Sequence, residues 1–297
     1  MGSESNVSRE IARQPECWRK AATVATDAAG LPEPGERVAV VGCGTSRYIA
    51  AAFAALREQR GAGETDAFAA SEWPERRRYD RVLAISRSGT TTEVVGLLRK
   101  LRERAPTTVI VADPTTPAAG LAEQSVVLGF ADERSIVQTR FATSTLALLR
   151  AHLGEDVDVL AQQAESALAD ALPEQWGEAT QFTFLGCGLG AALADEAALK
   201  IRETSQSWAE SYPAMEYRHG PMSITDERSL VWFLGEPPRM LVDEARRFGA
   251  TVVHADRDPM AELVRVQRLA VTVAERRGLD PDRPRNLARS VVLPPPA

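Results

Sequence analysis

The chain has 297 residues and a net charge of −6, with 44% hydrophobic and 26% charged residues. This composition is typical of a water-soluble globular protein with a sizeable core. The negative charge excludes a general attraction for nucleic acid or for an anionic membrane, so any anion must be bound locally. The length exceeds one average domain and suits two domains or one duplicated unit.

Neither a membrane span nor a signal-type N-terminus is evident in the sequence, so we expect a cytoplasmic protein. The three cysteines show neither the pattern of a disulfide framework nor metal-ligand spacing, and we expect no metal and no cofactor. Lysine is rare: only Lys20, Lys100 and Lys200 stand among 35 basic residues. Because lysine and arginine are not interchangeable, a retained lysine is a candidate for a chemical role.

The first half of the chain reads as an α/β unit that follows a short helical segment. Residues 1–31 favour a helix that buries Ile11, Trp18 and Val24, and Pro32 begins the break that ends it. Continuous apolar runs then predict strands buried on both faces of a parallel sheet. The strands are expected at 37–41, 80–85, 108–112 and 125–128, and the helices at 48–59 and 93–104.

The same order of elements returns after a helical stretch at about 145–171. A second Gly-Cys-Gly turn begins at Gly186, 144 residues after the first at Gly42. The second set of strands is expected at 182–185, 228–234, 250–254 and 269–273, with a helix from about 191 that ends before Pro213 and another at 240–248. Such repetition indicates a duplicated domain. We therefore predict an α/β protein with two doubly wound, flavodoxin-like parallel-sheet domains in tandem, at 32–152 and 179–297, after a helical segment at 1–31 and joined by a helical linker at 153–178.

Hydroxyl side chains follow the first two predicted strands. They come at the ends where open α/β sheets bind ligands, and the turn at Gly44 leads into a helix N-terminus, which offers backbone N–H groups to an anion. Hydroxyls with such groups suit a phosphate monoester, although Ser and Thr also cap helices for structural reasons. At these turns no P-loop lysine and no ribose-binding acid is evident, which argues against ATP and NAD there. The hydroxyl residues are Thr45, Ser46, Ser86, Ser88, Thr90, Thr91 and Thr92.

A second candidate site lies in the second half of the chain. Lys200 and Glu203 stand three apart on a predicted helix, so their side chains leave the same face. His219 follows on a loop, between Arg218 and a Gly-Pro turn. A carboxylate base, a neighbouring cation and a histidine make an acid/base site. The alternative is a solvated Lys/Glu face followed by a polar loop.

Six short blocks in a fixed order resemble a known family. They are 42–46 (GCGTS), 86–91 (SRSGTT), 133–139 (ERSIVQT), 198–203 (ALKIRE), 216–221 (EYRHGP) and 284–290 (PRNLARS). On these blocks the chain resembles tandem sugar isomerase (SIS) proteins over essentially its whole length. Within that family it is most similar to the isomerase half of glucosamine–fructose-6-phosphate aminotransferase and to stand-alone amino-sugar-phosphate deaminase/isomerases.

The resemblance implies roles for both groups of residues. It implies that Glu203 shuttles a proton between C1 and C2 of a sugar, that Lys200 supports it, and that His219 opens the sugar ring, donated across a homodimer. A carboxylate within reach of both carbons can perform this transfer, and a histidine can move protons near neutral pH. The implied binding site for the sugar phosphate consists of Gly44, Thr45, Ser46, Ser86, Ser88, Thr91 and Gln138.

The chain departs from the family pattern at two arginines. Arg289 stands where the aminotransferase carries a lysine near the sugar, and it can neither form an imine nor shuttle a proton. Arg87 replaces a neutral residue in the phosphate loop, where it either favours an anionic substrate or points outward. Both count as candidate substrate-binding residues. Residues 1–31 are too few for a glutaminase domain, so we expect no glutamine-fed synthesis and favour the catabolic direction.

Three functions of different classes remain open from the sequence. The first is an amino-sugar-phosphate deaminase/isomerase that releases ammonia and a ketose phosphate. The second is a deglycase that splits a 6-phosphorylated fructosamine. The third is a non-catalytic sugar-phosphate sensor, against which the retention of Glu203, Lys200 and His219 argues. The expected partners are a small phosphorylated sugar and a second copy of the chain, with no nucleic acid and no membrane.

Overall fold

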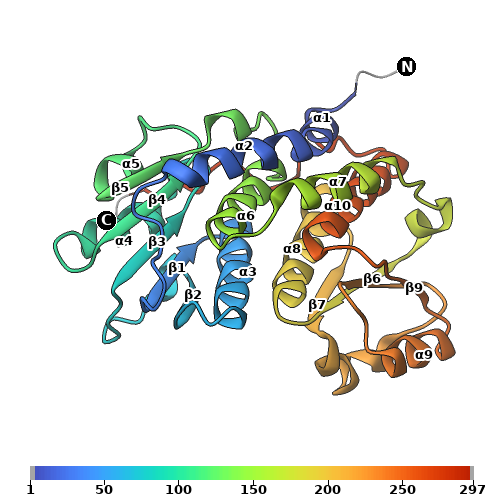
Figure 1. Cartoon of the computed structure of the whole chain (residues 1–297). Helices are drawn as coiled ribbons and strands as arrows, with labels where there is room; N and C mark the ends of the chain where they lie inside the picture. The colour runs from blue at the N-terminus through green and yellow to red at the C-terminus, as the bar shows by residue number, and fades with distance from the viewer. Residues whose placement is uncertain (1–3, 295–297) are drawn as a thin grey trace. The chain divides into compact units, whose positions relative to one another are not determined.

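The computed structural model describes residues 4–294, and its strands form two sheets in which every pair of neighbours is parallel (Figure 1). The chain divides into two compact units, which we name after their sheets. The five-stranded unit comprises Glu16–Glu133, Arg140–Val157 and Ala288–Ala297, and the four-stranded unit comprises Met1–Pro15, Arg134–Thr139 and Asp158–Leu287. An α/β fold with parallel sheets is thereby confirmed. No helix within residues 4–294 combines the length and the apolar character that crossing a membrane requires.

The five-stranded unit has the strand order β2-β1-β3-β4-β5, which is that of flavodoxin-like sheets. Its three central strands are apolar and almost entirely buried, as the continuous apolar runs predict. Helix α3 lies against β1, β2 and α6. The elements are α2 (Gln14–Asp27), β1 (Val38–Gly42), α3 (Thr45–Gln59), β2 (Thr65–Ala69), β3 (Arg81–Ile85), α4 (Thr92–Leu101), β4 (Thr107–Val111), α5 (Pro117–Leu121), β5 (Gln124–Val127) and α6 (Arg140–His152).

The four-stranded unit has the order β7-β6-β8-β9, which repeats the first four positions of the other sheet. Helix α8 packs on β6 and β7 and lies against α10. Its elements are α1 (Asn6–Ala12), α7 (Val157–Ala169), β6 (Gln181–Gly186), α8 (Leu189–Ser205), β7 (Ala209–Pro213), β8 (Ser229–Leu234), α9 (Arg239–Arg247), β9 (Thr251–Val253) and α10 (Pro259–Arg276).

The two Gly-Cys-Gly turns have the same backbone geometry. Gly44 has φ 54° and ψ −127°, and Gly188 has φ 53° and ψ −121°; each stands just before a helix. The first glycine of each turn packs closely against the helix that follows, because an added Cβ would lie 2.6 Å from the backbone of Ser46 at Gly42 and 2.2 Å from that of Gly190 at Gly186. The repeat in the sequence thus corresponds to a repeat in the backbone.

The prediction of a strand at 269–273 is wrong, because these residues lie inside α10. Their β-branched character favours a strand locally, but the helix begins with stronger signals. Asp258 caps it by accepting a hydrogen bond from the N–H of Met260 at 2.9 Å, and Pro259 occupies its first turn. The helix is then buried along most of its length, which compensates for the weak intrinsic helix propensity of valine and threonine.

The sequence prediction missed β2 and β7, which pair with β1 and β6. Helix α8 ends at Ser205, before Pro213 as predicted, with Gln206 in the left-handed conformation. The N-terminal segment forms two helices where one was predicted. Trp18 on α2 is buried and donates its indole N–H to the Thr143 hydroxyl at 2.8 Å.

Candidate functional site

Two groups of predicted site residues lie in different units, and each is described by itself. Thr45 and Ser46 begin α3 in the five-stranded unit, and each is only 4% exposed. They follow Cys43, whose thiol pKa is raised mainly by burial and to a smaller extent by the negative charge of Glu93. The turn therefore combines a helix N-terminus, two buried hydroxyls and a thiol held in its neutral form. A helix N-terminus with neutral hydrogen-bond donors beside it can bind an anion.

The loop after β3 holds its hydroxyls close together. The hydroxyl oxygen of Ser86 accepts a hydrogen bond from the N–H of Gly89 at 3.2 Å, and that of Ser88 accepts one from the N–H of Thr90 at 3.3 Å. The Ser88 and Thr91 hydroxyl oxygens lie 3.5 Å apart. The structure thus brings Ser86, Ser88 and Thr91 together at the carboxyl end of a central strand, as the sequence predicted for a phosphate loop.

The C-terminal tail, residues 288–294, lies on this loop. The Ser290 hydroxyl oxygen accepts hydrogen bonds from the hydroxyls of Ser88 at 3.1 Å and Thr90 at 2.9 Å. The N–H of Thr92 donates to the carbonyl of Val291 at 3.1 Å, and the Thr92 hydroxyl oxygen accepts from the N–H of Leu293 at 2.8 Å. Ser290 therefore uses two of the hydroxyl donors that would otherwise be available to an anion.

The two candidate arginines of this unit hold the tail in place. Arg87 does not point outward: it is 2% exposed and forms an ion pair at 3.2 Å with the buried carboxylate of Glu133. It also donates to the carbonyl of Arg289 at 3.2 Å. The Arg289 guanidinium in turn donates to the carboxylate of Asp132 and to the carbonyl of Glu133. Both guanidiniums are thus engaged with the protein itself.

The Lys200–Glu203 pair lies near the end of α8 in the four-stranded unit. The Lys200 ammonium is 1% exposed and lies 2.5 Å from Oε2 of Glu203 and 3.3 Å from Oε1 of Glu196. Glu196 is as buried as the lysine, whereas the Glu203 side chain is 19% exposed. One buried cation therefore holds two carboxylates, of which only Glu203 reaches solvent. This arrangement leaves one carboxylate of the cluster accessible to a ligand.

His219 and Gln138 lie in the same unit as this pair. His219 is exposed, at the end of a short 3₁₀ helix (Ala214–Arg218), and its ring makes no hydrogen bond or ion pair with residues 4–294. Gln138 is half-buried, and its buried side-chain oxygen has no partner within the described part of the chain. Both side chains are thus available for further contacts.

The sequence prediction missed two residues that contact the predicted site residues. Glu196 stands four residues before Lys200 on the same helical face, so its spacing could have revealed it. Ser290 is the last residue of the 284–290 segment, but no local pattern indicates that its hydroxyl contacts Thr90, 200 residues earlier in the chain.

No family model matches the chain. Among curated proteins, it is similar to the isomerizing glutamine–fructose-6-phosphate aminotransferase of Methanothermobacter thermautotrophicus, with 29% identity over 346 residues that cover 98% of this chain and 58% of that protein. The chain spans 50–58% of the length of the first curated relatives it matches.

Two solved structures have the same fold. The glucosamine-6-phosphate deaminase of Thermotoga maritima has a TM-score of 0.81 and 26% identity, over 97% of this chain and 100% of that one. The C-terminal domain of glucosamine-fructose-6-phosphate aminotransferase from Francisella tularensis has a TM-score of 0.80 and 20% identity, over 95% and 99% of the two chains. By their names, these relatives act on phosphorylated sugars, and the two deaminase and aminotransferase structures share the architecture of this chain over nearly its whole length.

Proposed function

We propose that the chain is a phosphosugar isomerase/deaminase of the SIS family, made of two SIS domains in tandem. Its substrates are an amino-sugar 6-phosphate and water, and its products are ammonia and a ketose phosphate. The solvent-reaching carboxylate of Glu203, held 2.5 Å from a buried ammonium, is the observation that carries this proposal. The likeness to a glucosamine-6-phosphate deaminase over 97% of the chain supports it.

Isomerisation requires one base that removes a proton from one carbon and returns it to the next. Glu203 fits this role because its carboxylate, paired with Lys200, remains partly exposed. His219 would take the anomeric proton and protonate the ring oxygen, for which an imidazole is suited. Its exposed ring fits a contribution to the site of a second subunit.

Phosphate binding is assigned to the five-stranded unit. The turn at Gly44, with Thr45 and Ser46, and the loop with Ser86, Ser88 and Thr91 would hold the phosphate through hydroxyl and backbone donors. A phosphate far from the reacting carbons provides binding energy that orients the sugar. Arg87 and Arg289 would act indirectly, by fixing the tail beside this loop.

Replacement of Glu203 by glutamine tests the proposal. Glu203→Gln keeps the shape but removes the base, so turnover should fall by a factor of about 10²–10⁴. Substrate affinity should stay close to that of the wild type, because the phosphate anchor is unchanged. Exchange of solvent hydrogen into C1 or C2 of the sugar should fall with turnover, and this readout does not require the final product to be known.

A panel of amino-sugar and fructosamine phosphates, assayed for release of ammonia or amine, identifies the substrate.

Glu227→Gln is the matched control for Glu203→Gln, because Glu227 is an exposed glutamate of the same unit. Glu227→Gln should leave both turnover and the exchange of substrate hydrogen unchanged. If Glu203→Gln still exchanges substrate hydrogen at the wild-type rate, the base lies elsewhere and the assignment is wrong.

A further inference from the structure

A cavity of about 560 Å³ lies in the five-stranded unit, at the edge of the sheet where β3 and β4 begin. Val82, near the start of β3, and Leu101, at the end of α4, form part of its wall. The loop of residues 86–92, which carries the clustered hydroxyls and is called the hydroxyl loop below, follows the opposite end of β3. Because a strand rises about 3.3 Å per residue, the five residues of β3 separate the two places by roughly 13 Å. The cavity is therefore distinct from the proposed phosphate loop.

The cavity is strongly basic, although the protein as a whole is acidic. Arg76, Arg78 and Arg104 line it, and their guanidiniums form no ion pair and no hydrogen bond with residues 4–294. Arg77 and the one acidic lining residue, Glu75, are each paired outside this group, Arg77 with Asp66 at 3.1 Å and Glu75 with Lys100. Since α4 ends here, the helix dipole offers no positive charge, and any anion must be bound by these side chains.

The remaining wall is apolar and aromatic. Trp73 and Tyr79 line the cavity, with their ring centroids 5.5 Å apart, and none of the lining residues is Ser, Thr, Asn or Gln. The Tyr79 hydroxyl is used in a hydrogen bond to Asp66 at 2.6 Å. A sugar phosphate would find few partners here for its hydroxyls. A flat ring that stacks on aromatic or guanidinium planes fits this wall better.

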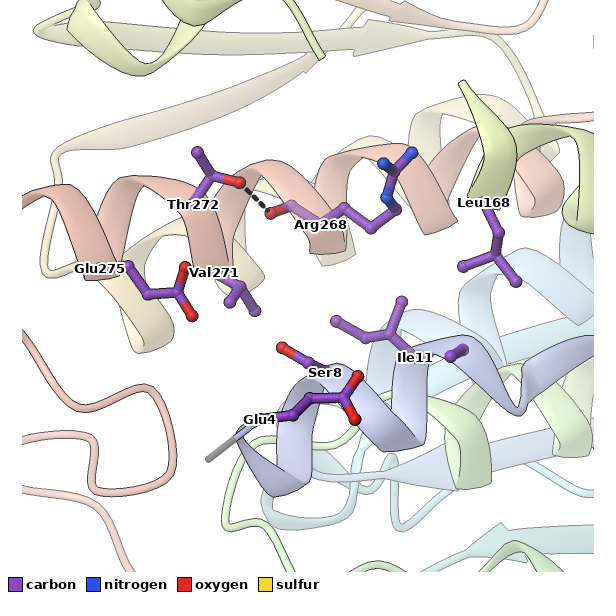
Figure 2. A pocket seen from close by; sticks show the side chains of 9 residues that line it. Glu4, Ser8, Ile11, Leu168, Arg268, Val271, Thr272 and Glu275 are labelled. Atoms are coloured by element: carbon purple, nitrogen blue, oxygen red, sulfur yellow. Dashed lines mark hydrogen bonds between the residues drawn. The ribbon is translucent and has the colours of Figure 1, made fainter. Parts of the chain in front are cut away.

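A second cavity shows what an unsuitable site looks like. It has a volume of about 330 Å³ and lies between α1 and α10 in the four-stranded unit (Figure 2). Its one arginine, Arg268, donates to the carbonyls of Ala167 at 2.7 Å and Asp170 at 2.8 Å. Glu4 and Glu275 line the same cavity. Its charge is thus unfavourable to an anion, unlike that of the arginine-lined cavity.

We infer that the arginine-lined cavity binds a nucleoside di- or triphosphate, as a site separate from the sugar-phosphate site. Guanidiniums bind phosphate oxygens through pairs of N–H donors, and three uncommitted ones can hold a chain of two or three phosphates. The base would lie against the wall formed by Trp73 and Tyr79. The volume falls within the range of about 300–1,000 Å³ that small-molecule sites occupy. No glycine loop is needed, because the donors are side chains.

Calorimetric titration of the full-length chain with ATP tests the inference, with inorganic tripolyphosphate as the probe that lacks the base. ATP should bind, and tripolyphosphate should bind more weakly. Arg76→Gln and Arg104→Gln should each weaken ATP binding by a factor of about 10–100, since each removes a charged hydrogen-bond donor. Arg99→Gln is the control, because Arg99 is an exposed arginine of α4 outside the cavity.

A Ser88→Ala variant separates this site from the phosphate loop. ATP affinity should be unchanged in Ser88→Ala and in Arg99→Gln. The inference is overturned if ATP does not bind, or if Arg76→Gln and Arg104→Gln bind it as the wild type does. It is equally overturned if Ser88→Ala abolishes binding, which would place ATP at the hydroxyl loop. Equal affinity for tripolyphosphate and ATP would exclude the aromatic wall and thus the nucleotide.

Discussion

Lys200 is a single buried cation between two carboxylates, and this makes it sensitive to replacement. Lys200→Met leaves the buried Glu196 without its ammonium partner, and breaking a buried ion pair typically costs about 3–5 kcal/mol of unfolding free energy. Urea unfolding followed by circular dichroism measures the change. The exposed Lys100–Glu75 pair provides the control, since Lys100→Met should cost less than about 1 kcal/mol.

A second substitution shows where this energy resides. In the Lys200→Met background, Glu196→Gln removes the carboxylate charge that has lost its ammonium partner and should recover part of the lost stability. Equal losses for Lys200→Met and Lys100→Met would contradict the view that the buried cation stabilises α8.

The reactivity of the Cys43 thiol measures how far the first Gly-Cys-Gly turn is buried. Burial and the charge of Glu93 raise its thiol pKa, so at any pH below that value less thiolate is present than for a free cysteine. Alkylation by iodoacetamide should therefore be slower at Cys43 than at the exposed Cys187, and its rate should rise at a higher pH than the value of about 8.5 usual for cysteine. Peptide mass spectrometry measures both rates. If the alkylation rate of Cys43 instead rises with a midpoint at or below that pH, the turn is open to solvent.

The sequence identified many residues of the candidate sites because their patterns are local. Lys200 and Glu203 are three apart on a helix, and this spacing alone brings their side chains together. The Gly-Cys-Gly turns were recognisable because Gly44 and Gly188 have a positive φ, and because the glycine two positions before each lies too close to the following helix for a side chain. The burial of Arg87 against Glu133 could not be predicted, because it depends on residues 46 positions apart.

At the scale of elements, the tail and the hydroxyl loop form one hydrogen-bonded assembly. Ser290 occupies the hydroxyl donors of Ser88 and Thr90. Ser290→Ala should free them, so inorganic phosphate should bind about two- to tenfold more tightly, as expected for one neutral hydrogen bond. Equilibrium titration with phosphate measures this. Ser71→Ala, at an exposed serine of the same unit, is the control, and weaker phosphate binding in Ser290→Ala would mean that the tail hydroxyl contributes to the site.

Helix α10 shows why the order of elements was not fully predictable. Residues 269–273 favour a strand when considered alone, and the helix is decided by its start at Asp258 and by packing against α8. The edge strands β2 and β7 were missed for a related reason. They are only partly buried, so they lack the continuous apolar runs that revealed the central strands.

At the scale of the whole molecule, the proposed role of His219 in the site of a second subunit can be tested by complementation. If this ring serves the active site of a second subunit, Glu203→Gln and His219→Ala are each inactive alone but complement each other in mixed dimers. At most one of the two sites in each mixed dimer is intact, so recovered activity stays below half that of the wild type. Mixing after mild denaturation and refolding, with exchange verified by tagged subunits, is the measurement. No recovery despite verified exchange would locate both residues in one subunit.

The division of the chain into units has a consequence for its synthesis. Residues 288–294 belong to the five-stranded unit and are synthesised after all of its other segments. While the chain is still being made, the hydroxyls of Ser88 and Thr90 lack their Ser290 partner, and the buried Arg87 lacks the carbonyl of Arg289. The sheet of this unit is complete long before, because β5 ends at Val127. The nascent chain therefore carries a finished sheet whose loop at residues 86–92 lacks these contacts until residues 288–294 are made, and a chain that stops after Leu287 would lack them permanently.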